Sequence, residues 1–223
     1  MTGGNRGLGL RIVKALAARG MRVVMASRSA AGGRAAIDLL GDLADRVAVR
    51  QLDITDPASV DRMLLAVRVL LGRCDVLVNN AAVLLEEDSD SVVSVDLDVA
   101  HRTLETNVLG TWRMAQAVVP MMRAQRYGRI VNIAGDLGRP GTVGHGLPAY
   151  RISKDTVNSL TRMLADELAG DGVLVNSYCP EVVPQDDDPS LFSAPVETPV
   201  WLATLPDGGP TGGCYQERAP SRR

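Results

Sequence analysis

The chain has 223 residues, of which 46% are hydrophobic, and its 24 basic and 26 acidic side chains leave a net charge of −2. This length and composition suffice for one buried core, and a charge so close to neutral gives no electrostatic basis for binding nucleic acid or an anionic membrane surface. No apolar run approaches the roughly 20 residues of a membrane helix, and the first residues lack the apolar stretch of a secretory signal, so we expect a cytoplasmic protein.

Apolar periodicity predicts helices that alternate with short strands. The first helix spans residues 8–19, because Leu8, Ile12 and Leu16 recur at helical spacing and Gly20 follows them. The sequence then predicts, in chain order, a strand at 21–26, a helix at 30–43, a strand at 46–52, a helix at 55–71, a strand at 76–78, a helix at 98–125 bent at Pro120, a strand at 129–133, a helix at 149–169, a strand at 173–179, a helical turn at 200–205 and a last strand at 213–215.

The alternation of strands and helices indicates an α/β fold, a doubly wound parallel sheet of Rossmann type with helices on both faces. One domain is expected over residues 1–215, with 216–223 as a disordered tail. Two stretches, 135–148 and 180–199, show no periodicity. Loops of this length in a compact domain usually carry function or are disordered.

The three cysteines, Cys74, Cys179 and Cys214, lie far apart in the sequence. Their spacing matches neither a disulfide framework nor a zinc site, so we expect no metal. The prediction is reduced thiols, as in other cytoplasmic proteins.

Three glycines, Gly3, Gly7 and Gly9, precede or open the first predicted helix. Glycine permits a positive φ and a close approach of the backbone to a phosphate, and the helix N-terminus offers free N–H groups. This spacing also suits a plain turn. Its position directly before a helix in an α/β chain favours a dinucleotide phosphate site.

The end of the second predicted element carries a cation where a dinucleotide-binding fold that prefers NAD usually has an acid. The sequence there reads Ala26-Ser27-Arg28, and Arg6 lies within the glycine loop. Two guanidinium groups near the adenosine ribose suit a 2′-phosphate, which favours NADP over NAD. The alternative is that both arginines are solvated surface residues.

Tyr150 and Lys154 lie at positions i and i+4 and therefore share one face of a predicted helix. An ammonium group near a phenol favours the phenolate, so we expect Lys154 to lower the pKa of Tyr150. The tyrosine then becomes a usable general acid or base near neutral pH. Taken alone, the same spacing also describes a surface pair.

These features occur together with further short motifs in one order. The chain reads Thr2-Gly3-Gly4-Asn5-Arg6-Gly7-Leu8-Gly9, Leu52-Asp53, Asn79-Asn80-Ala81-Ala82, Asn107 and Tyr150-Arg151-Ile152-Ser153-Lys154. In this order the motifs resemble the short-chain dehydrogenase/reductase superfamily, and in particular its NADP-dependent carbonyl reductases. The resemblance extends from Thr2 to about Tyr215.

The resemblance implies an oxidoreductase that transfers hydride between a nicotinamide and a small carbonyl or alcohol. It assigns the catalytic roles to Tyr150 as proton donor, Lys154 as its partner and ligand of the nicotinamide ribose, and Asn107 in fixing a water of the proton relay. It assigns cofactor contacts to the glycine-loop residues Gly3, Asn5, Arg6, Gly7, Leu8 and Gly9, to Arg28, to Asp53 and Ile54 at the adenine, to Asn79 and Ala81 at the floor of the cleft, and to Pro180. Ser153 is expected to be a packing residue.

Departures from the family pattern place full activity in question. Where the family has two serines after the fifth strand, the chain has Ala134-Gly135. The second serine orients the substrate carbonyl, and loss of one such donor typically costs roughly 10²–10³ in rate. Asp136 would repel a developing alkoxide unless it is protonated, and Thr142 is the nearest hydroxyl in the loop that follows.

Two further departures lie at other points of the chain. After the sixth family strand, Glu181 stands in place of a glycine and Gln185 in place of a threonine, and an acidic run at 186–188 follows. The family's first strand precedes the glycine loop, and this sequence shows no residues for it, so the first strand is expected to be missing. A start placed too late and a truncated product both account for this.

Two functions therefore stay open. One is an NADP-dependent reductase or dehydrogenase; the other is a cofactor-binding homologue with weak or no activity, acting as a sensor or partner subunit. The family also pairs its two long helices across a two-fold axis. We expect a homodimer or homotetramer in which apolar residues such as Leu160 and either Met163 or Leu164 face outward.

Overall fold

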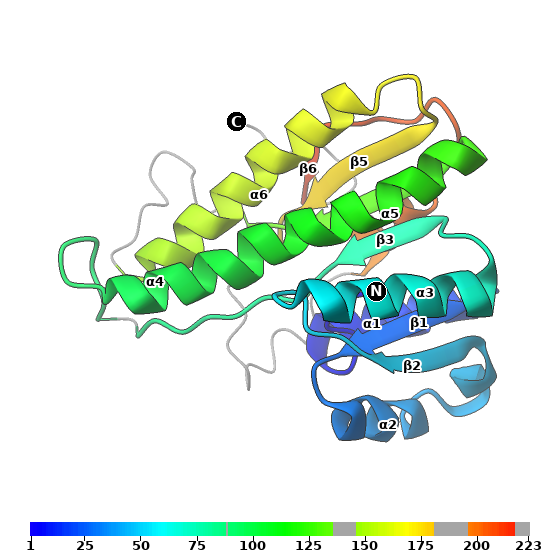
Figure 1. Cartoon of the computed structure of the whole chain (residues 1–223), viewed down its shortest axis with the longest axis horizontal. Coiled ribbons are helices and arrows are strands. Elements are labelled where there is room, and N and C mark those ends of the chain that lie inside the picture. Colours follow the sequence, from blue (N-terminus) through cyan, green and yellow to red (C-terminus); the bar gives the residue numbers. More distant parts are fainter. Residues whose placement is uncertain (88, 136–145, 181–195, 217–223) are drawn as a thin grey trace.

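The computed structural model describes residues 1–87, 89–135, 146–180 and 196–216, and Figure 1 shows their arrangement. The helices are α1 (Gly7–Ala18), α2 (Ala30–Asp38), α3 (Pro57–Leu71), α4 (Leu97–Leu104), α5 (Thr111–Gln125), α6 (Pro148–Glu167) and α7 (Glu197–Ala203), with a 3-10 turn η1 (Gly41–Arg46) and a π-helical segment η2 (Glu105–Gly110). The strands are β1 (Val23–Ser27), β2 (Val47–Gln51), β3 (Val76–Asn79), β4 (Gly128–Ile133), β5 (Val173–Tyr178) and β6 (Cys214–Tyr215).

Local sequence signals explain where several helices begin and end. The Asp56 carboxylate caps α3 by accepting the N–H of Ala58, and Pro57 occupies the first turn. Gly72 ends the same helix in a left-handed conformation with φ 72°. These signals explain why the predicted bounds of α3 agree with the structure.

Two helices differ from their predicted form. α2 ends at Asp38 because Leu40 turns into the core and Gly41, at φ 56°, reverses the chain into η1. The predicted helix at 98–125 is interrupted by η2, whereas Pro120 lies on the exposed face of α5 without ending it. A proline has no N–H for the carbonyl one turn earlier in the helix. On an exposed face water can bond to that carbonyl instead, so the helix continues.

The central sheet is divided in two. β1 pairs with β2, β3 to β6 pair in chain order, and every pairing is parallel. Between β1 and β3, Met1 donates its N–H to the Val24 carbonyl (3.1 Å) and Thr2 donates to the Val78 carbonyl (3.0 Å). Met1 and Thr2 thus bridge the two parts of the sheet, and the expected α/β fold, a doubly wound parallel sheet of Rossmann type, is confirmed.

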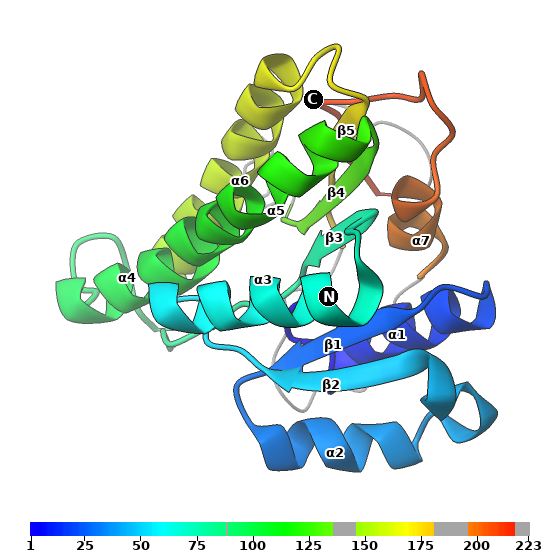
Figure 2. The ribbon, with the colours of Figure 1, turned by 45° about the vertical axis from the view of Figure 1, so that its right-hand side comes forward.

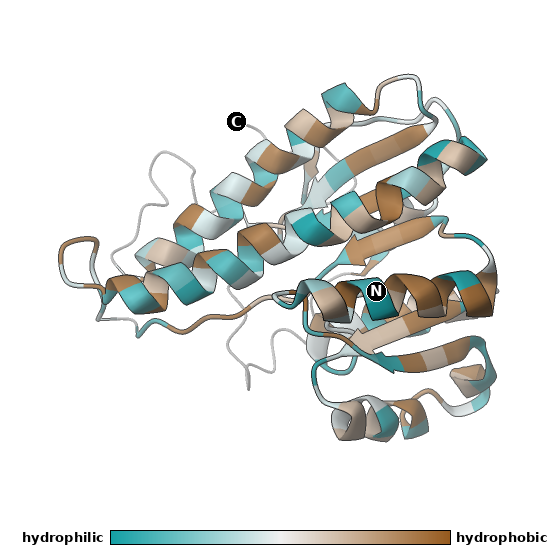
Figure 3. Cartoon of the chain, in the orientation of Figure 1, coloured by the Kyte–Doolittle hydropathy of each residue, from teal (hydrophilic) through white to brown (hydrophobic). Residues whose placement is uncertain are grey.

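Helices cover both faces of the divided sheet (Figure 2). One apolar cluster joins the strands to α3, α5 and α6, and a second joins them to α1 and α7. The strands between these layers are largely hydrophobic, as Figure 3 shows for β3 and β5, because they are covered on both faces. Among the described residues, no helix is both long and apolar enough to cross a bilayer.

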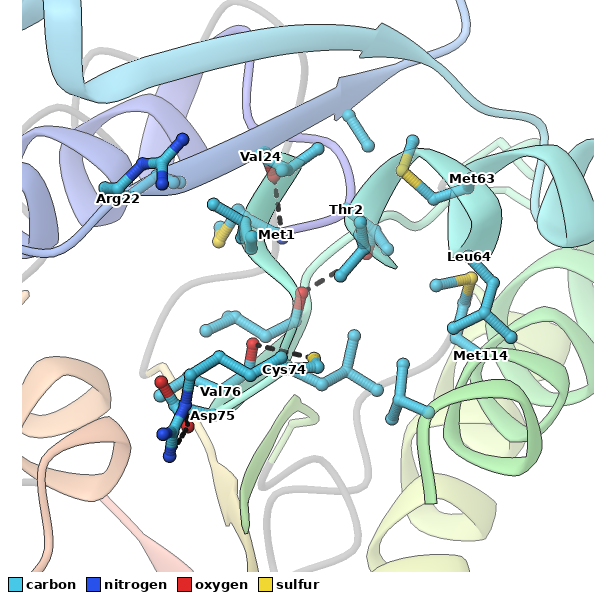
Figure 4. Close-up of a pocket in the computed structure, with 18 of the residues that line it drawn as sticks. Met1, Thr2, Arg22, Val24, Met63, Leu64, Cys74, Asp75, Val76 and Met114 are labelled. Atoms are coloured by element: carbon cyan, nitrogen blue, oxygen red, sulfur yellow. Dashed lines mark hydrogen bonds and ion pairs between the residues drawn. The ribbon is translucent and has the colours of Figure 1, made fainter. Parts of the chain in front are cut away.

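An apolar cavity of about 470 Å³ fills the gap between β1 and β3. Met63, Leu64 and Met114 line its helical side, with Met1 and Val24 opposite (Figure 4). Burial lowers the pKa of the Met1 amino group here, because desolvation disfavours a cation. The cavity lies away from the predicted catalytic residues, and most of its walls are apolar.

The expectation of reduced thiols is wrong for two cysteines. Cys179 and Cys214 form a disulfide, and their Cα atoms lie 6.5 Å apart. Cys214 belongs to β6, whose pairing with β5 brings it next to the end of that strand. Sequence spacing does not show this neighbourhood, because the two residues are 35 positions apart. Cys74 is a buried free thiol.

Candidate active site

A cleft of about 520 Å³ opens at the carboxyl ends of β1, β3 and β4, the edge at which doubly wound sheets bind ligands. Most of the predicted site residues line it. They are Gly3, Asn5, Arg6, Gly7, Leu8, Gly9, Arg28, Asp53, Ile54, Ala81, Tyr150, Lys154 and Pro180. Asn79 and Asn107 lie outside this lining. The fold thus brings the glycine loop and the Tyr–Lys pair to one cleft.

The glycine loop makes a tight bend into α1. Gly3 and Gly7 have φ of 61° and 51°, a region that favours glycine. A Cβ atom on Gly9 would collide with the carbonyl oxygen of Gly3 and lie 2.7 Å from Nδ2 of Asn80. The side chain at the N-cap of α1, that of Arg6, makes no capping bond. Gly7, Leu8 and Gly9, the first residues of the helix, line the cleft, and the free N–H groups of a helix N-terminus suit a phosphate.

The two neighbouring asparagines at the end of β3 point in different directions and make different hydrogen bonds. Asn79 points into the core, where its Nδ2 donates to Oδ1 of Asn132 (3.0 Å). Asn80 points to the cleft, where its Nδ2 donates to the carbonyls of Gly3 (2.8 Å) and Thr2 (3.2 Å). Sequence reasoning selected Asn79, but the alternation of side chains along a strand places Asn80 at the glycine loop.

Polar and charged groups at the ends of β1 and β2 line one end of the cleft. Ser27, Arg28 and Ser29 follow one another at the end of β1, and Arg28 is exposed. Asp53 accepts hydrogen bonds from the Thr55 hydroxyl (2.7 Å) and backbone N–H (2.9 Å). The hydroxyl bond chiefly, with Arg28 nearby, lowers the pKa of the Asp53 carboxyl. Asp53 is therefore a charged acceptor beside the arginine.

Tyr150 and Lys154 are both buried in the first turns of α6, with 3% and 4% of their surfaces exposed. The Lys154 Nζ donates to the carbonyl of Ile133 (2.9 Å) and lies 5.3 Å from the centre of the Tyr150 ring. The i, i+4 spacing thus produces a contact at the cleft rather than an exposed surface pair.

The expected effect of Lys154 on Tyr150 is wrong for this structure. Burial raises the pKa of Tyr150 and lowers that of Lys154 to about 8. Desolvation disfavours both charged forms and is the cause of both shifts. Tyr150 is consequently held protonated at neutral pH, the state of a proton donor.

Asn107 lies behind the cleft, in the π-helical segment η2. Its side chain accepts the N–H of Val83 (2.8 Å) and donates to the Val83 carbonyl (2.9 Å) and to the Ser153 hydroxyl (3.0 Å). Ser153 in turn donates to the carbonyl of Tyr150 (2.6 Å). These bonds tie the segment after β3 to the helix that carries Tyr150.

The residues at the missing serine positions are buried. Ala134 and Gly135 follow β4, and the Gly135 carbonyl accepts a hydrogen bond from Nδ2 of Asn158 (3.1 Å). The Oδ1 of Asn158 accepts the hydroxyl of Ser177 (2.7 Å). Asn158 lies one turn after Lys154 on α6, and sequence reasoning missed its role in holding Gly135.

Several predicted features fall outside the described residues, and the structure gives no account of them. They are Asp136 and Thr142, Glu181 and Gln185, the acidic run at 186–188 and most of the tail at 217–223. Within the described ranges, no group of three or more His, Cys, Asp or Glu side chains is arranged to hold a metal ion.

Comparisons with known proteins agree with this geometry. Residues 1–192 match the family described as short chain dehydrogenase. The chain is 30% identical to short-chain dehydrogenase/reductase 1 of Saponaria officinalis, over 96% of this chain and 92% of that protein. It is 33% identical to the 3-oxoacyl-[acyl-carrier-protein] reductase FabG of Escherichia coli, over 83% of this chain and 73% of that one. The crystal structure of gox2181 superposes with a TM-score of 0.77 at 29% identity, covering 86% of this chain and 77% of that one.

Proposed function

The chain belongs to the short chain dehydrogenase family, and from this premise we propose that it transfers hydride between NADP and a small carbonyl or alcohol. One observation carries the proposal: Tyr150 and Lys154 line the same cleft as the glycine loop. A proton donor and a phosphate cradle in one cleft are the two parts that such a reaction requires.

The glycine loop fits a dinucleotide. Gly9 leaves no room for a Cβ, and the first residues of α1 line the cleft beside it, so a pyrophosphate can approach the backbone closely. Arg28, Ser27 and Ser29 would hold the 2′-phosphate, and Asp53 and Ile54 the adenine side. Arg6 would add a second cation at this end.

The reaction itself follows from the state of the two buried side chains. NADPH, when bound, supplies the hydride. Tyr150, protonated at neutral pH, donates its phenolic proton to the carbonyl oxygen of the substrate. Lys154, with a pKa of about 8, is largely charged at pH 7, and its ammonium would stabilise the phenolate that remains. Asn107 and Ser153 would act through the main chain of Tyr150.

A specific observation keeps a second function in view. Gly135 stands where a hydroxyl would orient the carbonyl, and Asn158 fixes its backbone. A cofactor-binding homologue of low activity is the alternative. The variant Gly135→Ser separates the two: a rise in kcat supports the impaired enzyme, whereas an inert, NADPH-binding Gly135→Ser protein supports the sensor or partner role.

The substrate class and the assembly are also part of the proposal. The FabG relative acts, by its name, on a 3-oxoacyl group, which is a ketone. For a homodimer, the exposed apolar residues Trp112, Ile152 and Met163 offer a contact surface on α5 and α6. Of the expected outward-facing residues, Met163 is exposed, whereas Leu160 and the alternative Leu164 are buried, so the expectation for Leu160 was wrong. The cytoplasm remains the predicted location.

The test is a fluorescence titration with NADPH and NADH, followed by a screen of ketones and aldehydes. We expect NADPH to bind more tightly and at least one carbonyl to be reduced. Equal or tighter binding of NADH would contradict the cofactor assignment. NADPH binding without turnover of any carbonyl would instead support the low-activity homologue.

A further inference from the structure

Glu86 is a buried carboxylate that no motif of the chain singles out, and only 8% of its surface is exposed. Its two oxygens accept the backbone N–H groups of Ala149 and Tyr150, each at 2.7 Å. Glu86 lies in the segment after β3, more than 60 positions before these partners. The carboxylate therefore connects this segment to the first turn of α6, at the proposed proton donor itself.

The first turn of α6 has no other cap among the described residues. Leu147 precedes it with φ 56°, a left-handed conformation that is unfavourable for a leucine, and its side chain makes no capping bond. Pro148 has no N–H, and the N–H of Arg151 is bonded to the Leu147 carbonyl. Ala149 and Tyr150 are thus left with free donors, and Glu86 satisfies both.

The chemistry of the group suits this position. A carboxylate presents two acceptor oxygens to two adjacent N–H groups, and its negative charge interacts favourably with the helix N-terminus. The ion pairs found in the described part of the chain do not include Glu86, so the amides of α6 are its partners. A glutamine would offer one acceptor and would face the second N–H with a donor.

The same segment is fixed to α6 at a second point. Val83 is bonded twice to Asn107, which donates to Ser153, and Ser153 donates to the Tyr150 carbonyl. The N–H of Tyr150 is therefore held by Glu86 and its carbonyl by Ser153. Both ends of its main-chain unit are thus held, one by Glu86 and the other by Ser153, whose hydroxyl also accepts a hydrogen bond from Asn107.

We propose that Glu86 is a positioning residue, which fixes the main chain of Tyr150 and thereby the place of its phenol in the cleft. This rests on the proposed function. A misplacement of a reacting group by about 1 Å can cost roughly 100-fold in rate. Glu86 lies outside the lining of the cleft that holds the glycine loop, and cofactor binding is therefore expected to be independent of it.

The experiment compares Glu86→Gln with Glu87→Gln, in which the exposed neighbouring carboxylate is changed. For Glu86→Gln we expect kcat to fall about 10- to 100-fold with the Kd for NADPH within about twofold of the wild-type value. Glu86→Asp, which keeps both oxygens on a shorter side chain, should recover part of kcat. Glu87→Gln should leave both constants unchanged.

Hydrogen exchange supplies a readout that does not need turnover. In Glu86→Gln, amide exchange at 149–151 should accelerate at least about 10-fold, while exchange near Leu164 stays as in the wild type. Unchanged exchange at 149–151, unchanged kcat, or an equal loss of kcat and NADPH affinity would overturn the proposal. If the wild-type chain reduces no carbonyl, the proposed function fails separately, and the exchange at 149–151 alone decides on Glu86.

Discussion

Gly9→Ala tests whether the glycine loop is held as tightly as its contacts indicate. The new Cβ would collide with the Gly3 carbonyl and lie 2.7 Å from Nδ2 of Asn80. An ordinary contact begins at 3.4 Å, so the amide must retreat by 3.4 − 2.7, or about 0.7 Å. That movement would strain or break its hydrogen bonds to Gly3 and Thr2.

The magnitude follows from opposing terms. Overpacking costs about 1–3 kcal/mol and each weakened hydrogen bond about 1 kcal/mol, while alanine recovers about 1 kcal/mol of helix propensity. With two hydrogen bonds weakened, the free energy of unfolding should therefore fall by about 2–4 kcal/mol in chemical denaturation. The Kd for NADPH, measured by fluorescence titration, should rise at least about tenfold, which corresponds to about 1.4 kcal/mol, because the phosphate-facing backbone moves.

Gly20→Ala is the matched control. Gly20 has φ 85°, and no heavy atom beyond its chain neighbours lies within 4 Å of the position that a Cβ would occupy. Alanine there costs about 1–2 kcal/mol of backbone strain without touching the cleft. Measurable destabilisation with unchanged NADPH affinity is expected. If Gly9→Ala binds NADPH within about twofold of the wild type, the reasoning about close backbone approach is refuted.

Three further outcomes are expected. Arg28→Asp removes a cation from the proposed 2′-phosphate position and should therefore weaken NADPH binding relative to NADH binding. An unchanged ratio of the two dissociation constants would argue against this role of Arg28. Denatured, unreduced protein should show one reactive thiol, that of Cys74, whereas three reactive thiols would contradict the pairing of Cys179 with Cys214. Cys214→Ser should lower the free energy of unfolding by about 2–4 kcal/mol, because the disulfide closes a long loop. Burial lowers the pKa of Lys154 from 10.5 to about 8. Between these two pH values the unfolded state binds more protons than the folded state, so the free energy of unfolding should rise with pH relative to that of Lys154→Met. Parallel curves of the free energy of unfolding against pH for the two proteins would count against a buried lysine.

Much of the fold could be predicted because periodicity and caps act locally. Asp56 and Gly72 mark the two ends of α3 in the sequence, and in the structure they cap and end this helix. What failed depends on neighbours distant in sequence. The pairing of β6 with β5 joins Cys179 to Cys214, and no spacing rule reports that contact.

The candidate site shows the same division. Motifs located the glycine loop and the Tyr150–Lys154 pair, and the structure brings them to one cleft. The pKa of Tyr150 was misjudged because burial, a tertiary property that the local sequence does not show, raises it. Glu86 was missed because capping from a segment far upstream leaves no local signal, although strand alternation in the Asn79-Asn80 pair would have identified Asn80.

The most direct test of the account compares wild type with Tyr150→Phe in NADPH-dependent reduction of a ketone and aldehyde panel, with NADPH affinity measured on both proteins. Tyr150 is the proton donor of the proposed reaction, so the account predicts turnover by the wild type and a loss of at least about 100-fold in Tyr150→Phe, with the Kd for NADPH unchanged. Equal turnover by the two proteins would contradict it.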